Sequence, residues 1–109
     1  MDHPLELMFH NMKPSAELEA LVREQVSKLE QLHHIVRCRV TVGLPRHAHH
    51  SGNVPEIHLE IHLPGRDITV NHKHDQGGGA QRAVRDTFGA AKEQIKEYKA
   101  RRPAAKNVL

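Results

Sequence analysis

The sequence has 109 residues, 38% of them hydrophobic, which fits one domain with its own core and leaves no room for two. Its 16 lysines and arginines exceed 13 aspartates and glutamates, so the net charge of +3 modestly favours a polyanionic partner. Tryptophan is absent and only Phe9, Phe88 and Tyr98 are aromatic, which argues against binding by stacking bases on aromatic side chains.

Other broad features place the protein in a reducing, aqueous compartment. Cys38 is the single cysteine, so no intramolecular disulfide can form. The first residues show no basic region followed by an apolar run, as a secretory signal would require. No stretch approaches the roughly 18 apolar residues of a membrane span. We therefore expect a cytoplasmic protein without membrane contact.

The N-terminal third predicts a strand and then a helix. Leu5, Leu7 and Phe9 alternate with less apolar neighbours, so the odd positions of a strand are expected to face inward. Ser15 is a candidate N-cap, and apolar residues then recur at steps of three and four, which predicts a helix over about residues 16–33. These apolar residues are Leu18, Leu21, Val22, Val26, Leu29 and Leu32.

The middle of the chain predicts three more strands. Residues 36–42 alternate apolar and basic or polar side chains, which points Cys38 to the core. Residues 43–53 lack periodicity and contain Gly, Pro, Ser and Asn, as a loop does. Residues 57–63 alternate most clearly, and Pro64-Gly65 is a turn pair before the shorter alternation around Ile68 and Val70. The last two strands are therefore expected to form a hairpin.

A second helix is expected over about residues 80–99, from the recurrence of Ala80, Val84, Phe88, Ala91, Ile95 and Tyr98. The order βαβββα implies an α+β fold, a four-stranded sheet with two helices packed on one face. We expect one domain over residues 1–100 and a flexible tail over 101–109. The other sheet face would carry charges of mixed sign. An apolar face would favour a dimer and this polar one does not, so a monomer is expected. The residues expected on this other sheet face are Arg37, Arg39, Glu56, His58, Glu60 and His62.

The cations of the second helix gather on one side. At about 100° per residue, with Arg82 at zero, the apolar residues span about 160° to 240° and the cations about 260° to 360°. These cations are Arg82, Arg85, Lys92, Lys96 and Lys99. Such a stripe can follow phosphates while the helix stays packed. The alternative is an ordinary solvated helix face, the commoner meaning of a charge stripe in isolation.

The 11 histidines include two clusters, His47, His49 and His50, and His72 with His74. Neutral imidazoles at short spacing can bind zinc, copper or nickel. No cysteine is near and the spacing matches no structural zinc pattern, so polar or adventitious histidines are favoured. We expect neither a metal nor a cofactor.

No pattern in the sequence supports catalysis. Gly77-Gly78-Gly79 precedes a helix but lacks the Lys-Ser/Thr of a phosphate-binding loop. The serines lack the surroundings of a nucleophile, and Cys38 is expected to be buried and inert. Because nothing provides nucleophile, base and stabiliser together, neither an enzyme nor a small-molecule substrate is expected.

Several short motifs follow one another in a recognisable order. Residues 26–30 (VSKLE) end the first helix, Pro64-Gly65 makes the hairpin, residues 73–75 (KHD) precede the last helix and Ala83-Val84 lie inside it. In this order and spacing the chain resembles the short ribosome hibernation-promoting factors, or ribosome-associated translation inhibitors, of the sigma-54 modulation protein family. The resemblance covers roughly residues 5–100, and the family's fold is similar to the double-stranded RNA-binding domain.

The resemblance implies binding to the small ribosomal subunit and its rRNA, with translation inhibited and idle ribosomes preserved under stress. Lys28 carries over from the Lys-Leu-Glu match as an rRNA-binding residue. The helical-wheel argument adds the five cations of the second helix as further candidate rRNA-binding residues.

This chain departs from the family where Gln76 and the three glycines replace an acidic and an aromatic residue, and at Ala90 and Glu97, where lysines are usual. The sequence ends before the position of the C-terminal dimerisation domain of long members, so we expect a short form. The alternative function is a protein-interaction or metal-responsive module that uses the histidine-rich loops and the exposed sheet face.

Overall fold

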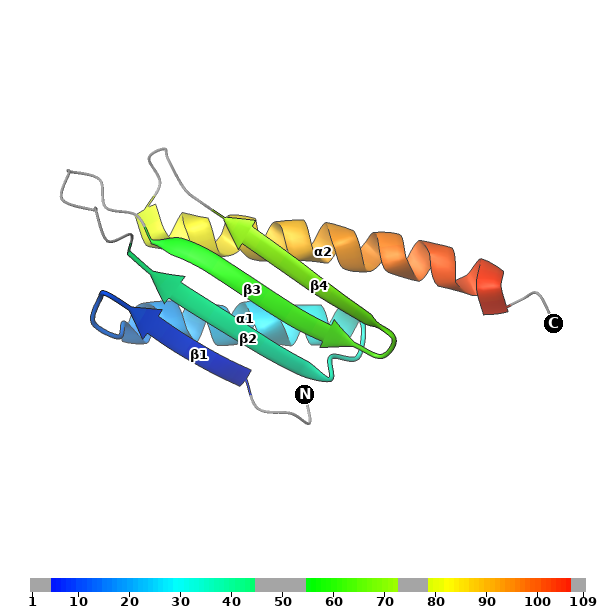
Figure 1. Cartoon of the computed structure of the whole chain (residues 1–109), viewed down its shortest axis with the longest axis horizontal. Helices are drawn as coiled ribbons and strands as arrows, with labels where there is room; N and C mark the ends of the chain where they lie inside the picture. The colour runs from blue at the N-terminus through cyan, green and yellow to red at the C-terminus, as the bar shows by residue number, and fades with distance from the viewer. Residues whose placement is uncertain (1–4, 45–54, 73–78, 107–109) are drawn as a thin grey trace.

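The computed structural model describes residues 5–44, 55–72 and 79–106, with side chains through Arg101. Its elements follow the predicted order βαβββα and confirm the α+β fold (Figure 1). In chain order they are β1 (Leu5–His10), α1 (Ala16–Leu32), β2 (Arg37–Gly43), β3 (Glu56–Leu63), β4 (Arg66–His72) and α2 (Gly79–Lys106).

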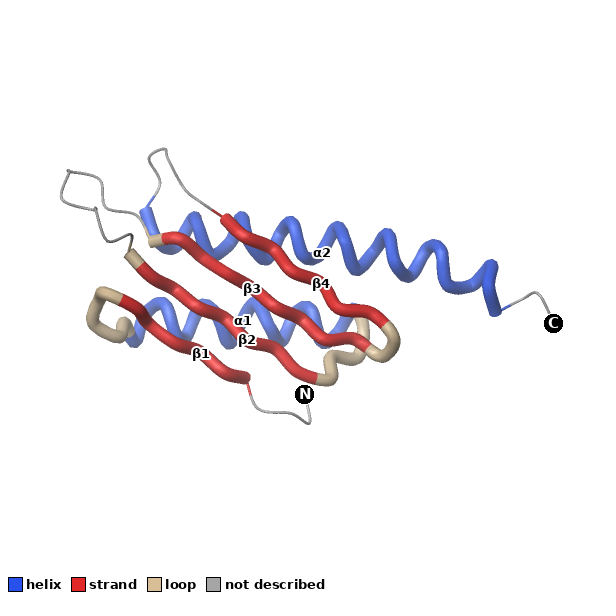
Figure 2. Tube along the Cα trace, viewed as in Figure 1, coloured by secondary structure: helices blue, strands red, loops and turns tan. Residues whose placement is uncertain are grey.

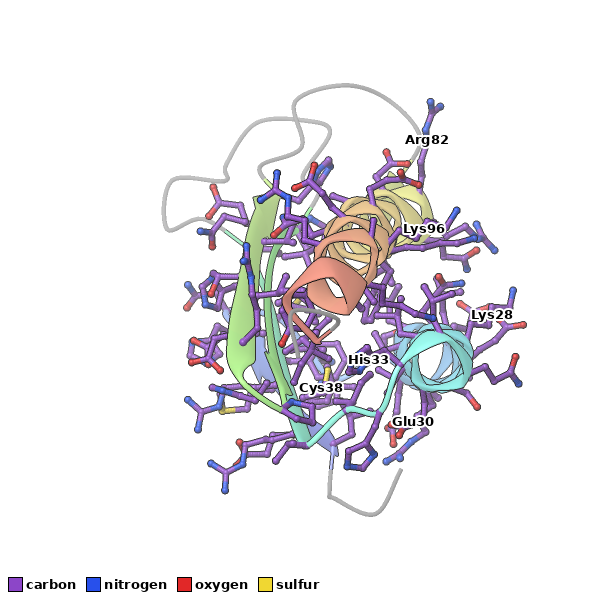
Figure 3. The ribbon with its side chains drawn as sticks, turned by 90° about the vertical axis from the view of Figure 1, so that its right-hand side faces the viewer. Lys28, Glu30, His33, Cys38, Arg82 and Lys96 are labelled. Atoms are coloured by element: carbon purple, nitrogen blue, oxygen red, sulfur yellow. The ribbon has the colours of Figure 1, made fainter. Side chains whose placement is uncertain are left out.

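The four strands form one sheet in the order β1-β2-β3-β4. β1 pairs with β2 in parallel, because α1 carries the chain back along the sheet between them, and the other pairs are antiparallel. Both helices lie on the same face of the sheet (Figures 2 and 3). Among the described residues no element covers the opposite face of the sheet, which is called the outer face below.

The core lies between the sheet and the helices. The inward rows of β2, β3 and β4 are buried, and α1 and α2 contribute the apolar stripes that the periodicity predicted. Cys38 is fully buried, and burial raises the pKa of its thiol to about 12, as expected for an inert cysteine. On β1, by contrast, Leu5, Leu7 and Phe9 face inward but stay only half-buried.

A neighbouring side chain fixes the start of α1, and a side chain from the other helix fixes its end. Ser15 caps the start, as predicted, by accepting a hydrogen bond from the backbone N–H of Leu18 at 3.2 Å. The last turn of α1 has no basic residue of its own, and Lys99 of α2 donates to the Leu32 carbonyl oxygen at 2.7 Å. A cation there complements the negative end of the helix.

The C-terminal half of α2 holds the hairpin turn and extends beyond it. The Tyr98 hydroxyl donates to the Pro64 carbonyl oxygen at 3.0 Å, beside Gly65, whose φ of 82° suits glycine. The helix continues past the predicted end at Lys99 to Lys106. Apolar periodicity predicts only the part of a helix that carries an apolar stripe. Ala100, Arg101 and Arg102 favour further helix, whereas Pro103 does not, so no local preference accounts for the last turn. The division into a domain and a flexible tail stays a prediction.

Candidate nucleic-acid interface

A groove of about 670 Å³ runs between α1 and α2 on the side of the helix layer away from the sheet. Each helix contributes one row of side chains at steps of three and four. The α1 row supplies Gln25, Lys28, Leu29, Gln31 and Leu32, and the α2 row supplies Arg85, Phe88, Gly89 and Lys92. Leu29 and Phe88 are buried and form the floor, so the groove is an apolar seam between polar walls.

Three of the six predicted site residues line this α1–α2 groove: Lys28 from one wall, Arg85 and Lys92 from the other. All three are exposed, and no acidic residue lines the groove with them. Within the described part of the chain none of the three has an ion-pair partner within 4.0 Å. Their charges therefore point at solvent without neutralisation, which is the arrangement a polyanion requires.

The other three predicted cations lie outside the groove. Arg82 points away from α1 (Figure 3) and stands 3.8 Å from the carboxylate of Asp86. Lys96 projects on the same side as Lys28 but stands 3.9 Å from Glu93. Lys99 is engaged at the end of α1, as described above. The helical wheel placed these residues on one stripe but could not show which of them faces α1.

Glu30, the acidic residue of the Lys-Leu-Glu motif, stabilises the connection between α1 and β2. Its Oε2 accepts hydrogen bonds from the backbone N–H of Ile35 and from His34 Nδ1, both at 3.2 Å. Lys28 points outward two residues earlier (Figure 3). The motif thus joins a solvent-facing cation to a carboxylate that fixes the end of the helix.

We expect Glu30→Ala to lower the free energy of unfolding by about 1–2 kcal/mol, because it leaves the partly buried N–H of Ile35 without its acceptor. Glu30→Gln keeps an amide oxygen at the same place and should lose less. Urea denaturation of the two variants measures the difference. Equal losses would contradict a role for the acceptor oxygen.

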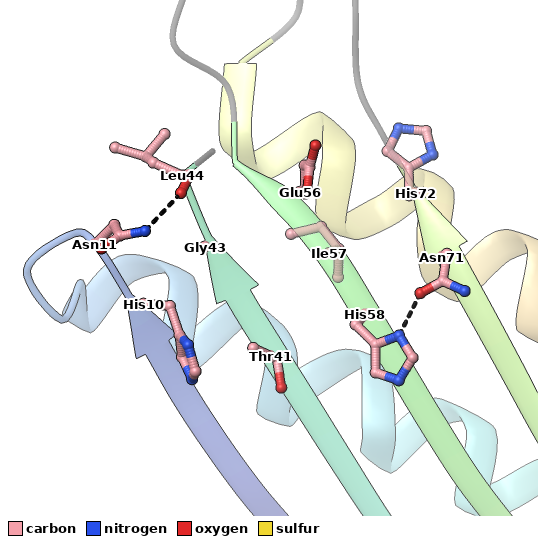
Figure 4. Close-up of a pocket in the computed structure, with 10 residues that line it drawn as sticks. All are labelled: His10, Asn11, Thr41, Gly43, Leu44, Glu56, Ile57, His58, Asn71 and His72. Carbon is pink, nitrogen blue, oxygen red and sulfur yellow. Dashed lines mark hydrogen bonds between the residues drawn. The ribbon is translucent and has the colours of Figure 1, made fainter. Parts of the chain in front are cut away.

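Charges on the outer sheet face are paired across the strands. Arg39 of β2 donates to Glu6 of β1 at 3.0 Å and lies 4.0 Å from Glu60 of β3. His58 Nε2 donates to Glu60 at 3.0 Å, and His58 Nδ1 donates to Asn71 Oδ1 of β4 (Figure 4). This ladder crosses all four strands. Within the ladder Glu6 and Glu60 neutralise Arg39, so the outer face suits a phosphate backbone less than the groove does.

The ladder makes stability depend on pH. The pKa of His58 is raised above its usual 6.5 by the hydrogen bonds to Asn71 and Glu60, and the pKa of Glu60 is lowered below its usual 4.5 chiefly by the hydrogen bond from His58. A histidine whose pKa is raised by folding contributes its full stabilisation below about pH 6.5. This stabilisation is lost as the pH rises through the pKa of the histidine in the folded protein. A carboxylate whose pKa is lowered by folding contributes its full stabilisation above about pH 4.5. This stabilisation is lost as the pH falls through the pKa of the carboxylate in the folded protein.

We therefore expect wild type to exceed His58→Gln in stability most clearly between about pH 4.5 and 6.5, with the difference shrinking on both sides. Chemical denaturation of both proteins at a series of pH values measures this. A difference that grows steadily above pH 7 would contradict the arrangement of the ladder.

An open hollow of about 360 Å³ lies at one end of the outer face, and His10, His58 and His72 are among the residues that line it, with Asn11 and Asn71 (Figure 4). Among the described residues no group of three or more His, Cys, Asp or Glu is placed to hold a metal ion. His47, His49, His50 and His74 lie outside the described residues, as do Gln76, Gly77 and Gly78. The metal-responsive alternative gains no support from the part of the chain that is described.

Gly89, Gln25 and Gln31 were not predicted as site residues. A Cβ at Gly89 would meet nothing within 4 Å, so no close packing requires glycine at this exposed position on the groove wall. The spacing of Arg85, Gly89 and Lys92 places all three on one side of the helix, which was the available signal. That this side faces a second row on α1 depends on how the helices pack.

Comparison with known proteins agrees with the fold. A ribosomal subunit interface protein from Coxiella burnetii matches with a TM-score of 0.72 and 15% identity, over 91% of this chain and 99% of that one. The N-terminal domain of Thermus thermophilus Protein Y matches with a TM-score of 0.67 and 15% identity, over 85% of this chain and 94% of that one. No curated protein matched the sequence. No described helix is long and apolar enough to cross a membrane.

At 15% identity these two structures show only that the fold is shared. The family is established by the sequence instead. A family model described as Sigma 54 modulation protein / S30EA ribosomal protein matches residues 5–103. That span contains every described strand and the groove between the helices. The resemblance drawn from the short motifs is thereby confirmed, and the chain belongs to the sigma 54 modulation protein / S30EA ribosomal protein family.

Proposed function

We propose that this chain is a non-catalytic ribosome-associated factor that binds rRNA of the small subunit through the α1–α2 groove and thereby inhibits translation and promotes ribosome hibernation under stress. The groove carries the proposal, because Lys28, Arg85 and Lys92 line it, no acidic residue lines it with them, and none of the three has an ion-pair partner among the described residues. Family membership and the structural likeness to a ribosomal subunit interface protein support the choice of the ribosome as partner.

The chemistry of the groove favours phosphates over bases as the ligand. Two ammonium groups and one guanidinium provide charge, and Gln25 and Gln31 add amides that can donate to phosphate or ribose oxygens. No tyrosine or tryptophan lines the groove, and its one aromatic residue, Phe88, is buried in the floor. Recognition would then depend on backbone shape and charge, as is common for folded RNA.

Sedimentation with ribosomes through sucrose gradients at low and high salt tests the proposal. We expect the protein to migrate with the small subunit at low salt and to dissociate at high salt, since each cation bound to a phosphate releases counterions. If the three groove cations each contact a phosphate, a plot of the logarithm of the binding constant against the logarithm of the salt concentration should have a slope of about −2 or steeper. Failure to bind small subunits at low salt would contradict the proposed function.

A further inference from the structure

β1 is an edge strand whose outer side pairs with no other described strand. It pairs with β2 over residues Leu5 to His10 and has no further neighbour in the sheet. Edge strands in monomeric proteins are usually blunted by lysine, proline, a bulge or an inward-pointing charge. The six residues of β1 contain no lysine or proline, and their register with β2 runs without a bulge.

The apolar row beneath this β1 edge is incompletely covered. Leu5, Leu7 and Phe9 stay half-buried and, with Pro14, Glu19 and Arg23, line a second groove of about 340 Å³ against the start of α1. At the opposite edge of the sheet, α2 packs against β4 and buries Ile68 and Val70. Among the described residues the two edges of the sheet therefore differ, because α2 covers β4 whereas the apolar row of β1 stays partly exposed.

The sequence of β1 is complementary to itself in one antiparallel register. When Met8 is placed opposite Met8 of a second copy, Glu6 falls opposite His10, and Leu7 falls opposite Phe9 on the inner face. The carboxylate of Glu6 can accept a hydrogen bond from the imidazole, and the aromatic–aliphatic pair extends the apolar row. Centring the pairing on Leu7 instead would place Glu6 against Met8, which loses the polar match.

Met8 supports the same register independently. It is the only large hydrophobic side chain that the described residues leave exposed, at 42%. It lies at the centre of the outer row of β1, between Glu6 and His10. In the register described, the two copies of Met8 would cover each other at the symmetry axis.

We propose that the β1 edge is a docking site for a second copy of this chain, which adds its own β1 in antiparallel orientation and makes one sheet of two copies. The two-fold contact is closed, because each copy uses its β1 edge and leaves β4 at the outside. The α1–α2 groove lies on the other side of the helix layer, so its cations stay accessible in the dimer. This proposal replaces the expected monomer, which rested on the polar outer face and took no account of the edge.

The contact is small, below about 1,200 Å² in total, so a weak and concentration-dependent dimer is expected. Sedimentation velocity of the wild-type chain, measured up to about 1 mM protein, should show reversible dimers. Met8→Lys should remain a monomer throughout, because two ammonium groups would then face each other across the axis. Circular dichroism should show Met8→Lys folded, since the side chain it replaces is exposed.

Oxidative cross-linking tests the register. Cysteines at directly opposed positions lie near disulfide distance, so Met8→Cys should form a covalent dimer under mild oxidation. Thr69→Cys, exposed on the outer face of β4, is the matched control and should stay monomeric. Cys38 does not interfere, because it is buried with a raised pKa.

A wild-type protein that stays monomeric at the highest concentration would overturn the proposal, even if the edge proved to bind an extended segment of another protein. A dimer that survives Met8→Lys, or equal cross-linking of Met8→Cys and Thr69→Cys, would show that copies associate through another surface. None of these measurements uses ribosomes, so their outcome is independent of the proposed rRNA binding.

Discussion

Replacing Lys28, Arg85 and Lys92 together by glutamate is expected to abolish association with small ribosomal subunits, lowering the affinity by at least about 100-fold at moderate salt. The three cations come from two helices and face one groove, so reversing them converts a site for phosphate oxygens into one that repels them. All three side chains are exposed and none pairs with an acidic residue among those described, so the fold should persist. Co-sedimentation over a range of salt concentrations measures the loss.

The matched control reverses three exposed cations away from the groove, Lys13, Arg23 and Arg37, which changes the net charge by the same amount. If binding depends on where the charges lie, this control should retain most of its affinity and salt dependence. Equal losses in both triple variants would mean that net charge alone drives association. Unchanged binding of the groove variant would remove the α1–α2 groove as the interface.

Phe88→Ala is expected to lower the free energy of unfolding by about 3–5 kcal/mol, the usual cost of removing a buried aromatic ring. Phe88 is 1% exposed and lies under the groove where α2 meets α1. A domain of this size has a total stability of about 5–15 kcal/mol, so the loss is a large fraction of it. The melting temperature should fall by more than about 10 °C.

Gln94→Ala on the exposed side of the same helix is the control, and its stability should stay within about 0.5 kcal/mol of wild type. Thermal and urea denaturation of both variants give the comparison. A loss below about 1 kcal/mol for Phe88→Ala would mean that the two helices repack around the missing ring, contrary to a close-packed floor.

The elements of this protein could be predicted because their signals are local. Alternation of Ile57, Leu59 and Ile61 allows only a strand with one buried face, and Ser15 before a three-and-four repeat marks the start of α1. The end of α2 was placed too early, since the apolar repeat ends at Tyr98 whereas the helical backbone continues to Lys106. The motifs were sufficient to identify the family because they sit in the order in which these elements follow one another.

The candidate site was predicted only in part. The helical wheel placed the cations of α2 on one stripe, and it treated Arg82, Arg85 and Lys99 as equivalent. The packing of α1 against α2 separates them, because it brings Arg85 to the groove, leaves Arg82 beside Asp86 and takes Lys99 to the carbonyl of Leu32. A wheel describes one helix, whereas each of these contacts needs a second element.

The sequence by itself thus determined the strands, the helices, the buried rows and the family, since each follows from periodicity and short motifs along the chain. Only the tertiary structure decided which cations share a surface, which charges are neutralised across the sheet, and that the apolar row of β1 remains half-covered. These properties depend on distances between residues far apart in the chain, such as Lys28 and Lys92, or Arg39 and Glu6. The first distance is set by the packing of two helices on one face of a sheet and the second by the register of β1 against β2, and no local pattern specifies either.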